Sequence, residues 1–393
     1  MAPCVQWPAG PCCAGRIGDR SWGALDDAEE SQARAAGAVA GRDPRPSMHN
    51  TNLGEAFVSF QIRPFDTETA SDRELSEYHL ARAAAWQLES PEDPPVTYEA
   101  AVGRLRTPWP SDGECRYWAG YVDGVLVGLG KLSLPGAENS GIAQTEVTVH
   151  PDFRRQGIGT ELLRALMLAV RDSGRPTVNG SALKAGSSGA AWAGRLGFRV
   201  VNRTVIQELV INQTKPELWD VPVPDGYRLT SWVGSIPEEL IASYAVARQA
   251  VQDAPLGESS IRLPRWDPAR IRREERELAE QGTEERVVVA IQQATGEVIG
   301  VSGILTYAYR PESSFVNETS VVATHRGNGL GRAMKAAMMR QLIVERPQVR
   351  RVVTSTNADN VHMIAVNDAI GYQILRRLIW VEATPDVLTE ALR

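Results

Sequence analysis

One short pattern occurs twice in this chain, with 172 residues between corresponding positions. In both copies a Val-rich segment leads into Arg-x-x-Gly-x-Gly, at residues 154–159 and again at residues 326–331. Amphipathic helices are predicted directly after the two copies, over residues 158–170 and 330–344. A pattern repeated at this distance predicts one strand–loop–helix unit that the chain uses twice.

A turn of this composition between a strand and a helix is suited to binding phosphate. The first N–H groups of a helix have no partner within the helix, and the helix dipole adds positive charge at the same place. Glycine lets the backbone come close to a phosphate, and arginine adds a fixed charge with several donors. For either copy taken alone, the alternative is an ordinary βα turn that binds nothing.

Two other nucleotide-binding loops fit the pattern less well. A dinucleotide-binding turn requires Gly-x-Gly-x-x-Gly/Ala and an acidic residue about twenty positions later. Here an arginine precedes the glycines, and the downstream residues do not supply that acid in a βαβ context. The Gly-Lys-Ser/Thr of a nucleoside triphosphate loop is absent from both copies.

The residues around both loops resemble those of the GNAT superfamily of N-acyltransferases. In the first copy, Val149-x-Pro151-x-x-Arg-Arg-Gln-Gly-Ile-Gly resembles the acyl-CoA pyrophosphate loop of that superfamily. The second copy resembles a GNAT subgroup with His-Arg-Gly-x-Gly-Leu-Gly, and the likeness continues through Lys335, Asn357, Asn360, Met363, Asn367 and Tyr372. The resemblance covers about residues 55–385. It implies an α/β fold with two tandem GNAT-like domains, each a mixed, mostly antiparallel sheet flanked by helices.

The resemblance also implies that acetyl-CoA or another acyl-CoA is the donor and that each loop holds one pyrophosphate. The cofactor-binding residues implied in the first unit are Val147, Val149, Arg154, Arg155, Gln156, Gly157, Ile158, Gly159 and Thr160. Those implied in the second unit are Val321, Arg326, Gly327, Asn328, Gly329, Leu330, Gly331, Arg332, Asn357 and Asn360. For Asn357 and Asn360, local capping of a turn is the alternative to contact with the pantetheine arm.

Moving an acyl group from a thioester to an amine requires a neutral amine and a donor for the oxyanion. Glu146 and Glu318 lie on the strands before the loops and are candidate bases; the alternative is a strand-edge acid paired with an arginine. GNAT enzymes often have a tyrosine general acid in the last helix, where this chain has Ala193 and Asn367. Because the second unit has Asn357 and Asn360 as well as the loop, we take Glu318 as the preferred base.

Composition narrows the class of protein. The net charge of −6 gives no overall basic surface for nucleic acid, and no run of eighteen apolar residues predicts a membrane span. Four cysteines without a disulfide framework suit a reducing cytoplasm, which is the expected location. The histidines show no metal-ligand spacing, so no metal site is expected.

The chain divides into four segments on these signals. Residues 1–54 read as a disordered extension, with Met48 as a candidate translation start. Residues 55–213 form the first GNAT-like domain, with residues 198–211 as the strand that closes its sheet. Residues 214–225 are a Pro-rich linker, and residues 226–393 form the second domain with the same order of elements.

Several functions remain open at this point. The leading one is N-acyl transfer, most simply acetyl transfer, to a small-molecule amine in antibiotic or thiol-metabolite biosynthesis or resistance. One alternative uses an acyl group tethered to a carrier-protein phosphopantetheine. The basic cluster Arg262, Arg265, Arg270, Arg272 and Arg273 would dock such a carrier, although a solvated helix face paired with the glutamates that follow is the favoured interpretation of that cluster. The other is a protein that binds CoA without catalysis, because both tyrosine positions are substituted.

Overall fold

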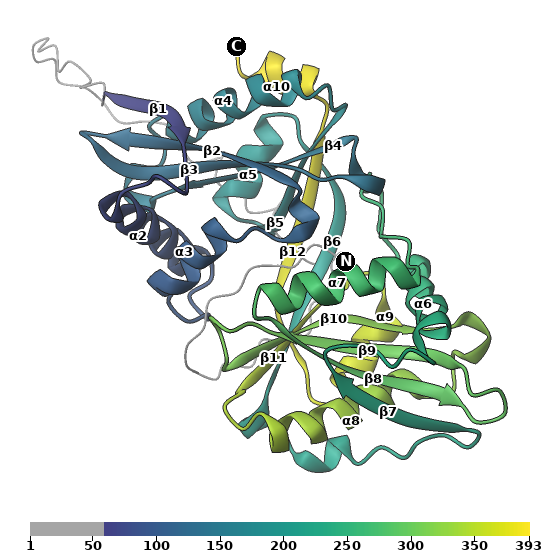
Figure 1. Ribbon diagram of the computed structural model, residues 1–393. Coiled ribbons are helices and arrows are strands. Elements are labelled where there is room, and N and C mark those ends of the chain that lie inside the picture. Colours follow the sequence, from purple (N-terminus) through teal and green to yellow (C-terminus); the bar gives the residue numbers. More distant parts are fainter. Residues whose placement is uncertain (1–58) are drawn as a thin grey trace, which may run out of the picture. The chain divides into compact units, whose positions relative to one another are not determined.

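The computed structural model describes residues 59–393, and Phe60–Arg393 form one compact unit (Figure 1). The expected extension over residues 1–54, including Met48, lies outside the described residues. We refer to residues 60–213 as the first half and to residues 214–393 as the second half.

The first half begins with a strand and two helices, followed by a strand hairpin. Helix α2 is capped by Ser71, whose hydroxyl forms a capping box with the Glu74 carboxylate. Asp123 and Gly124 have positive φ angles of 49° and 76°, which suit the tight turn of the hairpin. In chain order the elements are β1 (Phe60–Phe65), α2 (Asp72–Glu89), α3 (Tyr98–Arg106), β2 (Glu114–Val122), β3 (Val125–Leu134), β4 (Ile142–Val149), α4 (Ile158–Asp172), β5 (Thr177–Lys184), α5 (Ser188–Arg195) and β6 (Arg199–Val210).

The second half repeats this order and adds one helix at its end. The repeated order agrees with the expectation, drawn from the paired loops, of one α/β unit that the chain uses twice. Its elements are β7 (Tyr227–Val233), α6 (Ile241–Gln249), α7 (Pro268–Glu280), β8 (Glu284–Gln292), β9 (Val298–Thr306), β10 (Ser313–Val321), α8 (Leu330–Glu345), β11 (Arg351–Asn357), α9 (Val361–Asp368), β12 (Gln373–Ala383) and α10 (Pro385–Ala391).

The strands of the described residues join into one twelve-stranded sheet rather than two. Their order is β1-β2-β3-β4-β5-β12-β6-β11-β10-β9-β8-β7, and only the β4–β5 and β10–β11 pairs are parallel. The strand expected to close the first sheet, β6, does not pair with β5. Instead β12 of the second half lies between β5 and β6, and β6 pairs with β11. Each half therefore places its last strand in the sheet of the other (Figure 1).

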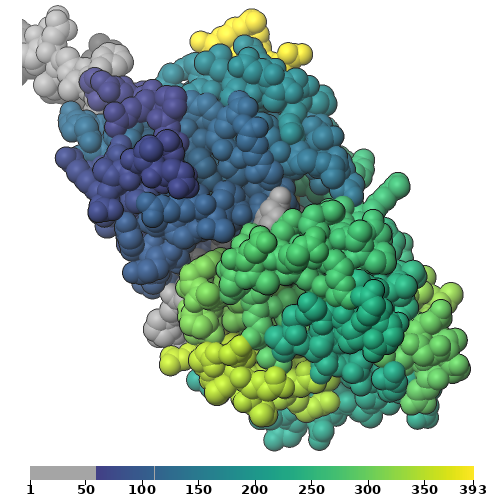
Figure 2. All heavy atoms as spheres, viewed as in Figure 1, coloured from purple at the N-terminus to yellow at the C-terminus, as the bar shows by residue number. Residues whose placement is uncertain are grey.

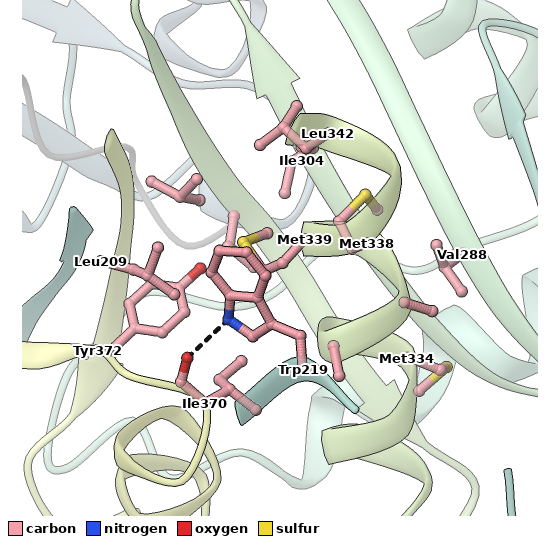
Figure 3. Packing of buried hydrophobic residues seen from close by; sticks show 14 of the residues in the cluster. Leu209, Trp219, Val288, Ile304, Met334, Met338, Met339, Leu342, Ile370 and Tyr372 are labelled. Atoms are coloured by element: carbon pink, nitrogen blue, oxygen red, sulfur yellow. Dashed lines mark hydrogen bonds between the residues drawn. The ribbon is translucent and has the colours of Figure 1, made fainter. Parts of the chain in front are cut away.

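Residues 214–225, expected to be a linker, contribute to the core of the second half. Trp219 is 1% exposed and packs among Leu209, Met339 and Tyr372 (Figure 3). Its indole N–H donates a 3.0 Å hydrogen bond to the Ile370 carbonyl. A buried tryptophan with a satisfied N–H fixes this segment in place.

The C-terminal helix α10 was not among the predicted elements, and it packs on the first half. Leu388 and Leu392 are buried in one cluster with Leu163 and Val170 of α4. The Arg164 side chain also donates a 3.1 Å hydrogen bond to the Leu392 carbonyl. The end of the second half thus covers the helix that follows the first loop.

Helix α7 lies on the surface of the second half (Figure 2). Three of its arginines, Arg270, Arg272 and Arg273, belong to the cluster considered for carrier-protein docking, and the first two are in ion pairs. Arg270 contacts Glu138 of the first half at 2.7 Å, and Arg272 contacts Glu275 at 2.8 Å.

None of the helices within residues 59–393 combines the length and the apolar character that a membrane-spanning helix requires.

Candidate active site

The two loops have the same backbone conformation. Gly157 and Gly329 precede helices α4 and α8 with φ angles of 88° and 77°. Two positions earlier, Arg155 and Gly327 also have positive φ, at 65° and 80°. In each copy the chain turns so that the first N–H groups of the following helix remain without a partner in that helix. Both turns therefore have the backbone form of an anion-binding site.

The arginine that opens each loop braces the turn. Arg154 Nε donates to the Val149 carbonyl at 3.1 Å, and Arg326 Nε donates to the Val321 carbonyl at 2.9 Å. Arg154 also pairs with Glu89 at 2.8 Å, and Arg326 pairs with Asp253 at 2.5 Å. Sequence reasoning treated these arginines as phosphate ligands. Their carboxylate partners indicate a structural role, and the helix N–H groups remain for phosphate.

The strand before each loop separates from its parallel neighbour. β4 pairs with β5 only as far as Thr145, opposite Gly180, and β10 pairs with β11 only as far as Val316, opposite Thr354. Beyond Thr145 the β4 strand is bonded to β3 alone within the described sheet. Its edge toward β5 therefore has no strand partner there. Apart from the Val149 carbonyl, which accepts from Arg154, the N–H and C=O groups of this edge suit the amide groups of a pantetheine arm.

A cavity of about 640 Å³ lies in the first half between these separated strands. The loop residues Arg155, Gly157, Gly159 and Thr160 line one part of it, and Glu146 lines another. One cavity therefore joins the anion-binding turn, the open edge of β4 and the first candidate base.

Glu146 faces this cavity and is held by a cation from α2. Its side chain is 45% exposed and contacts Arg82 at 3.1 Å. Burial raises the pKa of Glu146, but the positive charges of Arg82 and Lys131 outweigh that effect, and its pKa lies below the ordinary value. Glu146 is therefore a carboxylate at neutral pH.

The cavity also holds an ion-pair cluster around Asp112, which the sequence analysis did not predict. Asp112 contacts Lys131 Nζ at 2.6 Å and Arg104 at 3.1 Å, and the Arg104 guanidinium lies 4.2 Å from the centre of the Trp109 ring. All four side chains line the cavity. Of the four, only Trp109 has an unusual sequence context, since it stands between two prolines.

The second half supplies part of the cavity wall. β12 contributes Arg376, Leu378 and Val381, and the segment between α6 and α7 contributes Ile261. That segment is fastened to the first half, since the Arg262 N–H donates to Asn139 at 2.8 Å. Trp109 also packs edge-on against Tyr307, the residue that follows β9, with ring centres 5.1 Å apart.

Glu318, the preferred base at the sequence level, lies in different surroundings. Its side chain is 6% exposed and contacts Arg248 at 2.8 Å. Arg248 is 3% exposed, also pairs with Glu274 at 2.6 Å, and lies 3.4 Å from the centre of the Trp266 ring. A carboxylate enclosed in this way does not meet an acceptor amine, so the geometry does not favour Glu318 as the base.

Asn357 and Asn360 make local contacts. Asn360 caps α9 by accepting a hydrogen bond from the Met363 N–H at 3.2 Å. Asn357 accepts from the Asp359 N–H at 2.7 Å and donates to Asn202 at 2.7 Å. These contacts match the capping alternative. The two tyrosine positions also differ, since Ala193 lines the cavity while Asn367 is buried and donates to Gln207 at 2.8 Å.

Comparison with known proteins agrees with this geometry. Residues 82–178 match the model of the Acetyltransferase (GNAT) family. A protein of Salinispora arenicola named mycothiol acetyltransferase is 29% identical over 256 residues, which cover 64% of this chain and 75% of the relative. A protein of the same name from a Mycobacterium species is 26% identical over 260 residues, covering 63% and 76%.

Solved structures show the same arrangement over most of the chain. A tandem GNAT protein from the clavulanic acid biosynthesis pathway superimposes with a TM-score of 0.67 at 26% identity, covering 83% of this chain and 99% of that one. A GCN5-related N-acetyltransferase from Sphaerobacter thermophilus gives a TM-score of 0.62 at 18% identity, with 83% and 96% covered, which supports the fold alone.

Proposed function

Because the chain is a tandem GNAT N-acyltransferase, we propose that its first half transfers an acetyl group from acetyl-CoA to the amine of a small molecule. The observation that carries this proposal is the single cavity that joins the loop at 154–160 to Glu146. Donor and acceptor can meet there, whereas Glu318 in the second half is enclosed by its ion pairs.

Different residues of the first half bind the cofactor and accept the proton in this proposal. The N–H groups of Ile158, Gly159 and Thr160 receive the pyrophosphate, and the open edge of β4 over residues 146–149 aligns the pantetheine amides. Glu146, acting through a water, accepts the amine proton as the nitrogen bonds to the acyl carbon. The C–S bond then breaks, and the thiolate takes a proton from solvent, since no tyrosine lines the cavity among the described residues.

The acceptor is proposed as a small amine, and mycothiol-type precursors are one candidate because of the names of the relatives. CoA itself, rather than a carrier protein, is the proposed donor, since two of the five arginines considered for docking, Arg270 and Arg272, already pair with carboxylates. The second loop is proposed to bind CoA without turnover.

Matched substitutions test which half is catalytic. Glu146→Gln keeps the side-chain shape but removes the base, so kcat for CoA release should fall by roughly 10² to 10⁴. Glu318→Gln is the control at the corresponding position and should change kcat far less. A larger loss of kcat in folded Glu318→Gln would place the chemistry in the second half.

A further inference from the structure

Five charged side chains of the cavity lining lie close together: Arg82, Arg104, Lys131, Asp112 and Glu146. We call these the charge cluster. Three are cations and two are anions, so the cluster carries one positive charge in excess. Arg376 lines the cavity too, but its positive charge is paired with Asp93 and Glu92.

The excess positive charge lies around Asp112, because this one carboxylate has two cationic partners. Arg82 and Glu146 form one pair, while Asp112 Oδ2 alone serves both Lys131 and Arg104. These three side chains are only 11–15% exposed, so water screens them weakly. A buried charge without a counter-charge is costly, and a ligand anion offsets that cost.

The two cations at Asp112 keep hydrogen-bonding capacity. One of the three ammonium donors of Lys131 meets Asp112. Arg104 donates to Asp112 and to the Thr107 carbonyl, while its buried Nε has no hydrogen-bond partner among the described residues. Stacking on Trp109 fixes the orientation of this guanidinium. The group is therefore built to receive an anionic oxygen.

The position of Lys131 fixes how far that anion lies from the reacting amine. Lys131 on β3 lies directly opposite Glu146 on β4 in the sheet register. Facing residues of an antiparallel pair have Cβ atoms about 5 Å apart. A ligand that reaches both side chains needs only a few bonds between its amine and its anionic group.

Charge also selects against simple amines. An aliphatic amine is protonated near neutral pH, and a cavity with an excess positive charge disfavours a ligand that is only a cation. A ligand that carries an anionic group as well removes this repulsion.

We propose that the acceptor is a short zwitterion, an amine joined by a few bonds to an anionic group such as a carboxylate. Lys131 and Arg104 bind the anion, and the amine faces Glu146. The inference rests on the proposed function, because it names the acceptor of that same site.

Matched pairs of small molecules test it, each pair an α-amino acid and its decarboxylated amine, such as phenylalanine with phenethylamine. CoA release gives KM and kcat for each member, and calorimetry against the CoA-bound protein gives affinity without turnover. The amino acid should be preferred by roughly tenfold or more, as expected for hydrogen bonds to a charged group. Lys131→Met should remove that preference through KM, and Lys131→Arg should keep it. Lys215→Met, an exposed lysine outside the cavity, is the control.

The readouts separate the two ideas. Equal KM and equal affinity within pairs, or an equal change of both members in Lys131→Met, would overturn the zwitterion inference and leave acetyl transfer standing. Preferential binding of the amino acids without any CoA release would instead contradict the proposed function. Binding of neither member would overturn the inference.

Discussion

Arg82 pairs with Glu146 in the first half, and Arg248 pairs with Glu318 at the corresponding place in the second. The first pair opens on the cavity. The second is covered by Trp266 and shares its arginine with Glu274. The same two residue types thus line a cavity in the first half and form a buried ion pair in the second.

Removing Arg248 should therefore destabilise the protein strongly. Arg248→Met leaves two buried carboxylates without a counter-charge, at a cost of about 3–5 kcal/mol of unfolding free energy. Chemical denaturation followed by circular dichroism measures the change. Arg82→Met is the matched control and should cost clearly less, since Glu146 reaches solvent in the cavity. Equal losses would mean that the two pairs are equally enclosed.

Lys335 provides a pH-dependent prediction. It is 2% exposed, and burial lowers its pKa from 10.5 to about 7. Protonated Lys335 therefore lowers the free energy of unfolding. This destabilisation is complete below pH 7, where the lysine is charged in both states, and it disappears as pH rises from 7 toward 10.5. Lys335→Met should stabilise the protein by up to about 4 kcal/mol at pH 6.5. Denaturant titrations at several pH values should show this gain shrinking in alkali; a constant gain would contradict the shifted pKa.

At the scale of elements, the two loops offer a direct test of how many CoA molecules bind. A side chain at Gly331 meets no atom within 4 Å, and one at Gly159 meets only Val147 and Val149, at 3.7 Å or more. Alanine therefore fits at both positions. Glutamate brings a negative charge to the helix start, where phosphate is expected.

Calorimetry with CoA should accordingly give two sites per chain in the parent protein. Gly159→Glu and Gly331→Glu should each leave one site, and the alanine variants should keep two. If Gly331→Glu leaves the stoichiometry unchanged, the second loop is only structural.

Most elements were predictable because their signals are local. Residues 158–170 and 330–344 were predicted as helices, and they match α4 and α8 to within two residues. The loop glycines also marked both turns. The partner of β12 was not predictable, because an alternating apolar pattern specifies a buried face and not the neighbouring strand.

The charge cluster escaped prediction for a related reason. Asp112 and Lys131 lie on different elements, and only the β2–β3 hairpin brings them to 2.6 Å. Likewise, the sequence showed a charge at Arg154 but not Glu89, which lies 65 residues earlier. Site residues whose role depends on contacts with residues distant in sequence can be identified only once the fold is known.

At the scale of the whole molecule, the exchanged strands should make the halves unfold together. β12 bonds to β5 and β6 of the first half, so neither half keeps a complete sheet alone. Calorimetric melting should show one cooperative transition. Residues 60–213 produced separately should lack a stable fold, and co-expression with residues 214–393 should restore it. Two independent transitions would mean that each half is complete by itself.

The position of β12 also bears on synthesis of the protein. β5 ends at Lys184, but its neighbour in the sheet begins at Gln373, near the C-terminus. A ribosome adding about 5–20 residues per second needs roughly 10–40 s to make the intervening chain. During that time the emerging first half carries an uncovered strand edge of the kind that promotes aggregation. We therefore expect the nascent chain to depend on chaperones until its last strand leaves the exit tunnel.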